Sequence, residues 1–131
     1  MSVGDLTKLP TAGIQAVGHV TSICGNSTTM YIGYVSGHVK SLTTSGVLAD
    51  LTHKVLLPGR IVSVIYTGLT AILCAITADG KIYKITNVGV VTLLKNLNMG
   101  VCGAYYASNY LYIVLDGMQQ EKSNLVKLQL A

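Results

Sequence analysis

Apolar residues dominate the middle of the chain, where eighteen consecutive residues, 61–78, carry no charge. A helix that spans a bilayer needs about 20 such residues, so the length alone permits a membrane anchor. The stretch lacks a sustained helical period, however, and Gly68 divides it into two runs rich in Val, Ile and Thr. Short runs of this composition, separated by turn residues, predict β-strands.

The same order of runs recurs three times along the sequence. Gly18, Gly59 and Gly100 are spaced by 41 residues, and each precedes apolar runs separated by loops or by turns containing Gly, Asn or Asp-Gly. The counterpart of residues 61–78 in the first unit contains Asn26 and several Ser and Thr residues, which exclude a spanning helix. Because equivalent units share a structure, we expect two buried strands and no transmembrane segment at residues 61–78.

The pattern predicts an all-β protein of one domain, residues 1–131, with strand repeats at about 18–58, 59–99 and 100–131. The third unit ends after its third run, whereas residues 4–10 (GDLTKLP) resemble the fourth run of the first unit (ADLTHKVLLP). Closed rings of four-stranded blades use such an orphan fourth strand to lock their ends together. We therefore expect three four-stranded, propeller-like blades in each chain.

The segment ADGKIYKITNVGVVTLLKNL of the second unit resembles the blades of six-bladed β-propellers of the gluconolactonase-like and NHL-repeat kind. In those blades, a turn with Asp-Gly leads into a strand with Ile-Tyr and then into a strand with Gly-Val-Val. The resemblance implies a ring of six blades, of which one chain supplies three. A homodimer would complete the ring, since twofold association is the commonest closure of a homo-oligomer. A monomeric β-barrel or sandwich of the same strands is the alternative.

An incomplete ring leaves open sheet edges at both ends, which favour pairing with another chain. In the expected homodimer, the N-terminal strand of each chain completes the last blade of its partner. The residues expected at this oligomer contact are Asp5, Leu6, Thr7 and Lys8 at the start, and Leu125, Val126, Lys127 and Leu128 at the end.

Charge is sparse and evenly spread. Nine Lys and Arg residues against five Asp and Glu give a net charge of +4, and 11% of residues are charged, compared with about 25% in average proteins. The basic residues form no stripe, so nucleic acid is not an expected partner. Cys24, Cys74 and Cys102 lie far apart in apolar runs, which argues against a disulfide framework or a zinc site. The N-terminus lacks the pattern of a signal peptide.

No arrangement of residues predicts an enzyme. His19, His38 and His53 lack the HxH or HExxH spacing of metal sites, and Ser22 and Ser63 occupy equivalent strand positions instead of a GxSxG elbow. The acidic metal ligands of gluconolactonase-like enzymes are not recognisable here. We expect no catalytic residue, no metal and no cofactor.

A ligand site on one loop face is the second class of function. The loops between second and third strands and between fourth and first strands share one end of each unit. Together they would present His38, Arg60, Asp79, Lys81 and Asp116. Asp-Gly in two of these loops is also ordinary turn chemistry. Four tyrosines of the third unit form a dense patch that suits strand packing, or else an intersubunit or ligand-stacking surface: Tyr105, Tyr106, Tyr110 and Tyr112.

The loops are short and dissimilar, which favours a structural role over a lectin-like binding module or protein-interaction scaffold. Few carboxylates and many Ser and Thr residues suit an acidic extracellular setting, because carboxylates with pKa values near 4 are protonated at about pH 3. In length and composition, the chain resembles a structural protein of the two-tailed, spindle-shaped viruses of hot-acid archaea. This resemblance implies an acid-stable virion component that associates with itself and with other virion proteins. The cytoplasm is the alternative location.

Overall fold

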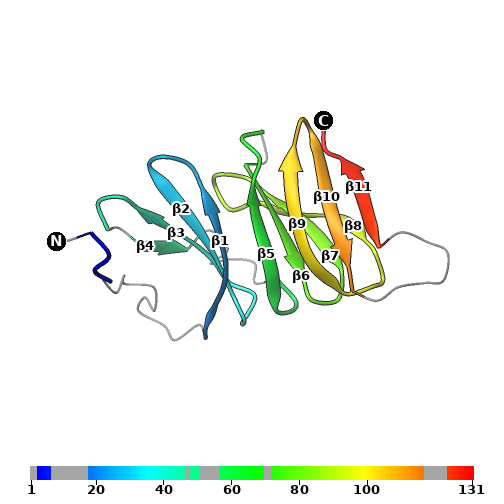
Figure 1. Ribbon diagram of the computed structural model, residues 1–131, viewed down its shortest axis with the longest axis horizontal. Helices are drawn as coiled ribbons and strands as arrows, with labels where there is room; N and C mark the ends of the chain where they lie inside the picture. Colours follow the sequence, from blue (N-terminus) through cyan, green and yellow to red (C-terminus); the bar gives the residue numbers. More distant parts are fainter. Residues whose placement is uncertain (1–2, 7–17, 47, 51–56, 70–71, 117–123) are drawn as a thin grey trace.

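The computed structural model describes residues 3–6, 18–46, 48–50, 57–69, 72–116 and 124–131. Within these residues the strands form three antiparallel sheets, each made of consecutive strands (Figure 1). The prediction of an all-β fold is confirmed.

Each sheet falls within one unit of the sequence repeat. The first sheet has the order β1 (Val20–Gly25), β2 (Thr29–Tyr34), β3 (Val39–Thr43) and β4 (Leu48–Asp50). The second has the order β5 (Ile61–Tyr66), β6 (Leu73–Thr77), β7 (Lys81–Ile85) and β8 (Val91–Asn96). The third has three strands in the described part of the chain, in the order β11 (Leu125–Gln129), β10 (Tyr110–Leu115) and β9 (Val101–Ala107).

The uncharged stretch 61–78 forms β5 and β6, which pair in antiparallel fashion, as the repeat predicts. No helix among the described residues is long and apolar enough to cross a membrane. All five residues of β6 are buried, which explains why this strand shows no alternation of apolar and polar residues.

The first two strands of every sheet pair with the same interruption. Their register shifts after the first residue pair, and the extra residue of the resulting β-bulge is Thr21, Val62 or Cys102 in the three sheets. A bulge increases the local twist of a strand and redirects a side chain. The hydroxyl of Thr21 thereby reaches the next sheet, where it donates a hydrogen bond to the carbonyl of Ile61 at 2.5 Å.

The first strands of neighbouring sheets contact each other, β1 with β5 and β5 with β9 (Figure 1). The backbone N–H of Val64 on β5 donates a hydrogen bond to the Ser22 hydroxyl on β1 at 2.9 Å. Gly33 on β2 permits the close approach, because a Cβ there would lie 2.7 Å from Cγ2 of Ile61. Ser22 therefore has a structural role, as its position in the sequence repeat indicates.

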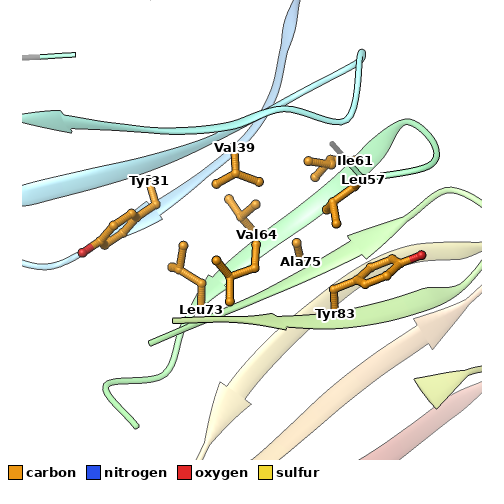
Figure 2. Close-up of a cluster of buried hydrophobic side chains, with 9 residues drawn as sticks. Tyr31, Val39, Leu57, Ile61, Val64, Leu73, Ala75 and Tyr83 are labelled. Atoms are coloured by element: carbon orange, nitrogen blue, oxygen red, sulfur yellow. The ribbon is translucent and has the colours of Figure 1, made fainter. Parts of the chain in front are cut away.

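Nonpolar side chains fill the space between the first and second sheets (Figure 2). Tyr31 and Val39 extend from the first sheet, and Leu73 and Ala75 extend from β6 of the second. The ring of Tyr31 also stacks on that of Tyr66, with 6.1 Å between the ring centroids. This cluster is the first core of the protein.

A second core lies between the second and third sheets. Cys74 and Ile76 on β6 pack with Leu111 and Ile113 on β10. Because successive side chains of a strand point to opposite faces, β6 contributes to the first core through Leu73 and Ala75 and to the second through Cys74 and Ile76. The middle sheet is thus covered on both faces.

The turn between β6 and β7 packs closely against the connection that leads to the third sheet. Gly80 has a φ of +89°, and its carbonyl accepts a hydrogen bond from the N–H of Leu97 at 2.9 Å. A Cβ at Gly80 would overlap the carbonyl of Met99, so the turn admits no side chain. Gly37 has the same relation to Leu57 in the first sheet.

We predict that Gly80→Ala lowers the free energy of unfolding more than Gly46→Ala does. Both glycines have nearly the same positive φ, +89° and +88°, but nothing lies within 4 Å of a Cβ at Gly46. Gly46→Ala therefore bears only the backbone strain, about 1–2 kcal/mol, whereas Gly80→Ala adds the overlap with Met99. Urea unfolding followed by circular dichroism measures both, and equal losses would contradict the close packing at Gly80.

Candidate functional site

The residues predicted for a loop-face ligand site lie in or beside the connections at one end of the sheets. His38 ends the β2–β3 turn, Arg60 precedes β5, Asp79 lies in the β6–β7 turn, Lys81 begins β7, and Asp116 follows β10. Equivalent backbone hydrogen bonds fix these connections in all three sheets. They run from Val35 N–H to the His19 carbonyl (2.9 Å), from Ala78 to Arg60 (2.8 Å) and from Asp116 to Gly100 (2.7 Å).

Asp79 is the centre of a small polar cluster in the second sheet. The hydroxyl of buried Thr77 donates a hydrogen bond to one carboxylate oxygen at 2.5 Å, and the Lys81 ammonium lies 3.3 Å from the other. The hydrogen bond from Thr77 and the neighbouring Lys81 hold the pKa of Asp79 below its usual value. These contacts order the β6–β7 turn.

The other predicted loop-face residues have separate surroundings. His38 Nδ1 lies 2.7 Å from the Ser36 hydroxyl within its own turn. Asp116 packs beside Gly100, and Arg60 joins the β6–β7 turn through its backbone carbonyl. The five residues therefore share one end of the fold without forming one constellation of side chains.

The described residues contain no group of three or more His, Cys, Asp or Glu side chains that could hold a metal ion. The cysteines are unpaired thiols. Burial raises the pKa of Cys24 to about 12 and that of Cys74 to about 11, so both stay protonated and unreactive at neutral pH. Cys102 is exposed.

The predicted oligomer contacts lie at opposite ends of the molecule. The described N-terminal segment, residues 3–6, lies at the end of the molecule that the first sheet forms, whereas β11 lies at the far side of the third sheet (Figure 1). Asp5 and Leu6 belong to no strand within the single chain, and Thr7 and Lys8 lie outside the described residues. The residues Leu125, Val126, Lys127 and Leu128 all belong to β11.

The side chains of β11 alternate between two environments. Val126 and Leu128 pack on the second core, whereas Leu125 and Lys127 are exposed on the other face of the third sheet. On that face, the Lys127 ammonium lies 4.6 Å from the centre of the Tyr110 ring, within the range of a cation–π interaction.

We call this outer face of the third sheet the open face. It carries exposed Tyr105, Val114 and Leu125 together with half-buried Tyr112. The strand pairings place these residues next to one another, since Tyr105 is opposite Tyr112 on β9 and β10, and Val114 is opposite Leu125 on β10 and β11. Cross-strand neighbours of this kind form one continuous apolar patch.

The corresponding positions of the other two sheets are covered. Leu125 is 55% exposed, but its equivalents Val39 and Ile82 are both 0% exposed. Val114, 38% exposed, corresponds to Ile76, which is 0% exposed in the second core. In the first and second sheets, this face packs against the sheet that follows in the chain. The third sheet repeats the apolar face without a following sheet among the described residues.

A hollow of about 270 Å³ lies between the second sheet and the residues that directly follow β11. Apolar side chains make most of its wall, and Lys84 supplies the charge. Its lining residues are Thr67, Leu69, Cys74, Lys84, Leu94, Leu130 and Ala131. We call it the rim hollow. A second, more open hollow of about 350 Å³ runs over the ends of β1, β5 and β9, where Tyr66, Tyr105 and Tyr106 line it.

No protein-family model matches the sequence, and no curated protein matches it. Similar solved structures identify the fold. The chain resembles Sqt1 of Saccharomyces cerevisiae with a TM-score of 0.62 and 17% identity, over 96% of this chain and 35% of that one. It also resembles the computationally designed protein Ika4, with a TM-score of 0.61 and 13% identity over 73% of this chain and 59% of that one.

A third similar structure is the computationally designed protein Ika8, with a TM-score of 0.59 and 13% identity over 73% of this chain and 30% of that one. The chain thus spans between 30% and 59% of the length of these three structures. Since Sqt1 is propeller-like, the fold of this all-β chain is propeller-like as well.

Sequence reasoning missed Val114 and the rim hollow. Val114 occupies the position of Gly33 and Ile76, so an alignment of the three units already places it on the face that receives the next sheet. The tyrosine patch was found in the sequence, but its division between two faces was not. Tyr105 and Tyr112 lie on the open face, whereas Tyr106 packs on the second core.

We predict that Asp79→Asn removes a pH-dependent part of the stability. The folded-state pKa of Asp79 lies below its unfolded value, so the carboxylate stabilises the fold above about pH 4, and this contribution is lost as the pH falls through the folded pKa. Melting temperatures between pH 2 and pH 6 should show wild type above the variant at pH 6 and a smaller difference at pH 2.

Thr77→Val serves as the control, because valine keeps the shape and removes the hydroxyl that bonds Asp79. The double variant should lose less than the two single variants combined, since both remove the same hydrogen bond. A difference between wild type and Asp79→Asn that does not change with pH would contradict the lowered pKa.

Proposed function

We propose that the protein is a non-enzymatic structural protein that acts by self-association, with the open face as its contact. The observation that carries this proposal is the exposure of Leu125, Val114 and Tyr105 at positions where the other sheets are covered. Contiguous apolar patches that are exposed in a soluble chain commonly mark interaction sites. Tyrosine at the edge of such a patch suits a protein interface.

The proposed assembly is a ring of six blades built from two chains of three blades. In it, the open face of each third sheet receives the first sheet of the partner, as the first sheet receives the second within one chain. The face of the first sheet that points away from the second sheet is apolar and carries Met30, Ile32, Tyr34 and Leu42. Its counterparts in the second and third sheets, among them Leu73 and Ile113, pack on a preceding sheet.

Ile32, Tyr34 and Leu42 are already buried within the single chain. In the proposed ring, the partner's third sheet therefore has to replace the residues that bury these side chains in the single chain. A twofold arrangement makes this exchange reciprocal, and both open faces are then closed by the same contact.

The proposed setting is a virion in an acidic environment, and other virion proteins are the proposed further partners. Composition supports this proposal, because only five of 131 residues are Asp or Glu. Among the described residues, the ion pair of Lys81 and Asp79 lies on the surface, where such pairs contribute little to stability. A fold held mainly by the two apolar cores loses little when its carboxylates are protonated.

A small propeller binding module with a site on the loop face is the second candidate function. The cluster of Asp79, Lys81 and Thr77 favours it, since a carboxylate and an ammonium at a turn can hold a polar ligand. The same cluster is satisfied internally by its own hydrogen bond and ion pair, so the open face is the better-supported site.

We predict that the chain forms a dimer of twice its 13.8 kDa mass and that Tyr105→Glu with Val114→Glu converts it to a monomer. Both side chains are exposed in the single chain, so the substitutions spare the two cores, but they place charges in the proposed contact. Light scattering at a range of protein concentrations measures the mass, and circular dichroism checks the fold.

Val88→Glu is the matched control, because Val88 is 76% exposed in the β7–β8 turn, away from the open face. It should leave the dimer intact. A wild-type chain that stays monomeric at every concentration, or a double Glu variant that stays dimeric, would refute association through the open face.

A further inference from the structure

The rim hollow lies where a fourth strand of the third sheet would run. In the second sheet, the fourth strand β8 pairs with β7, and its Val91 packs on the first core, against the preceding sheet. In the third sheet, β11 pairs with β10 on one side, and the rim hollow lies where β11 ends, between Leu130 and Ala131 and residues of the second sheet. β11 is thus the edge strand of the third sheet in the described part of the chain, with the rim hollow at its end, and extended chains add to such edges.

The sequence repeat gives the register that a fourth strand of the third sheet would have. In the first sheet, Asp50 on β4 pairs with Lys40, whose equivalent on β11 is Val126. The sequence Gly-Asp-Leu-Thr at residues 4–7 matches Ala-Asp-Leu-Thr at residues 49–52. This match places Asp5 opposite Val126, Val3 opposite Leu128 and Leu6 opposite Leu125.

Side-chain chemistry agrees with this register. Val3 takes the position of Val91, the residue of β8 that packs on the preceding sheet, so its side chain turns towards the rim hollow. Asp5 lies on the same side of the added strand as Val3. Leu6 lies on the opposite side, where it covers Leu125. Val3 and Leu6 are each fully exposed within the single chain and Leu125 is 55% exposed, so all three gain apolar contact.

Within the single chain, residues 3–6 form no strand beside β11. Residues 3–6 lie beside the first sheet, at the opposite end of the molecule from β11 (Figure 1). The second sheet and both cores separate the two places.

We infer that β11 and the rim hollow bind residues 3–6 of a second copy of the chain as a fourth, antiparallel strand, with Val3 towards the hollow and Leu6 against Leu125. This inference deepens the proposed self-association and rests on it. It assigns the rim hollow to an extended peptide segment of this same sequence, and it makes the exchange of strands reciprocal between two chains.

Disulfide trapping tests the register and the exchange together. Leu6→Cys is placed in one chain and Leu125→Cys in a second, tagged chain, both with Cys102→Ser to remove the exposed native thiol. Directly opposed strand residues have Cβ atoms within the range that a disulfide needs. Random pairing of equal amounts of the two chains places about half of them in heterodimers, and we expect these to migrate as a covalent heterodimer on a non-reducing gel after mild oxidation.

The matched control pairs Leu6→Cys with Val126→Cys, because residue 126 points to the other face of the sheet and should not cross-link. Light scattering of the unoxidised mixture separates the two possible failures. A dimer without a covalent heterodimer, or equal cross-linking at residues 125 and 126, would overturn the strand addition and leave the proposed self-association standing. A monomeric mixture would overturn both.

Discussion

The structure depends on one constraint. The second strand of each repeat unit is apolar on both faces, so each sheet has to be covered on both sides. The second sheet meets this condition within the chain, because Leu73 and Ala75 pack towards the first sheet while Cys74 and Ile76 pack towards the third. A β-strand that is buried on both faces reads as a continuous apolar run, which is why residues 61–78 look like a membrane span in the sequence. The same constraint leaves the third sheet with one apolar face to cover, and this face is the candidate site.

Close contacts at the bulged first strands set how the sheets stack. The hydroxyls of Thr21 and Ser22 make hydrogen bonds with backbone groups of β5, and Gly33 brings β2 within contact of Ile61. Each contact links a residue of one repeat unit to a residue of the next, at the same place relative to the bulge. The bulge and the contact between first strands recur at the second interface, where Val62 takes the place of Thr21 and Ile76 that of Gly33. For this reason the open face of the third sheet can be compared, position by position, with the covered faces before it.

The sequence was sufficient to predict the all-β class and the two strands within residues 61–78. Gly residues at a spacing of 41 and short runs rich in Val, Ile and Thr reflect local backbone preferences, which a single sequence carries. Which face of a sheet stays exposed could not be predicted in this way, because it depends on which surfaces meet in three dimensions. Tyr105 and Tyr106 are adjacent and identical in the sequence, yet one lies on the open face and the other on the second core. The predicted loop-face residues lie in or beside connections of the sheets, but which side chains meet there depends on turn geometry, as in the ion pair of Asp79 and Lys81.

The free-energy cost of association explains why the open face and the exchanged strand are proposed as parts of one interface. Full burial of a side chain such as Val, Leu or Phe contributes about 1.5–3 kcal/mol, and less for residues that are already half-buried, as on the open face. Two chains lose at least about 4 kcal/mol of translational and rotational freedom when they associate. The burial of three partly exposed side chains, Tyr105, Val114 and Leu125, therefore contributes little more free energy than association costs. In the proposed dimer, backbone hydrogen bonds along β11 and the burial of Val3 and Leu6 would add to the same interface. In a twofold assembly each contribution would count twice while the loss of freedom is incurred once, and this favours the proposed reciprocal exchange over a contact of the open face alone.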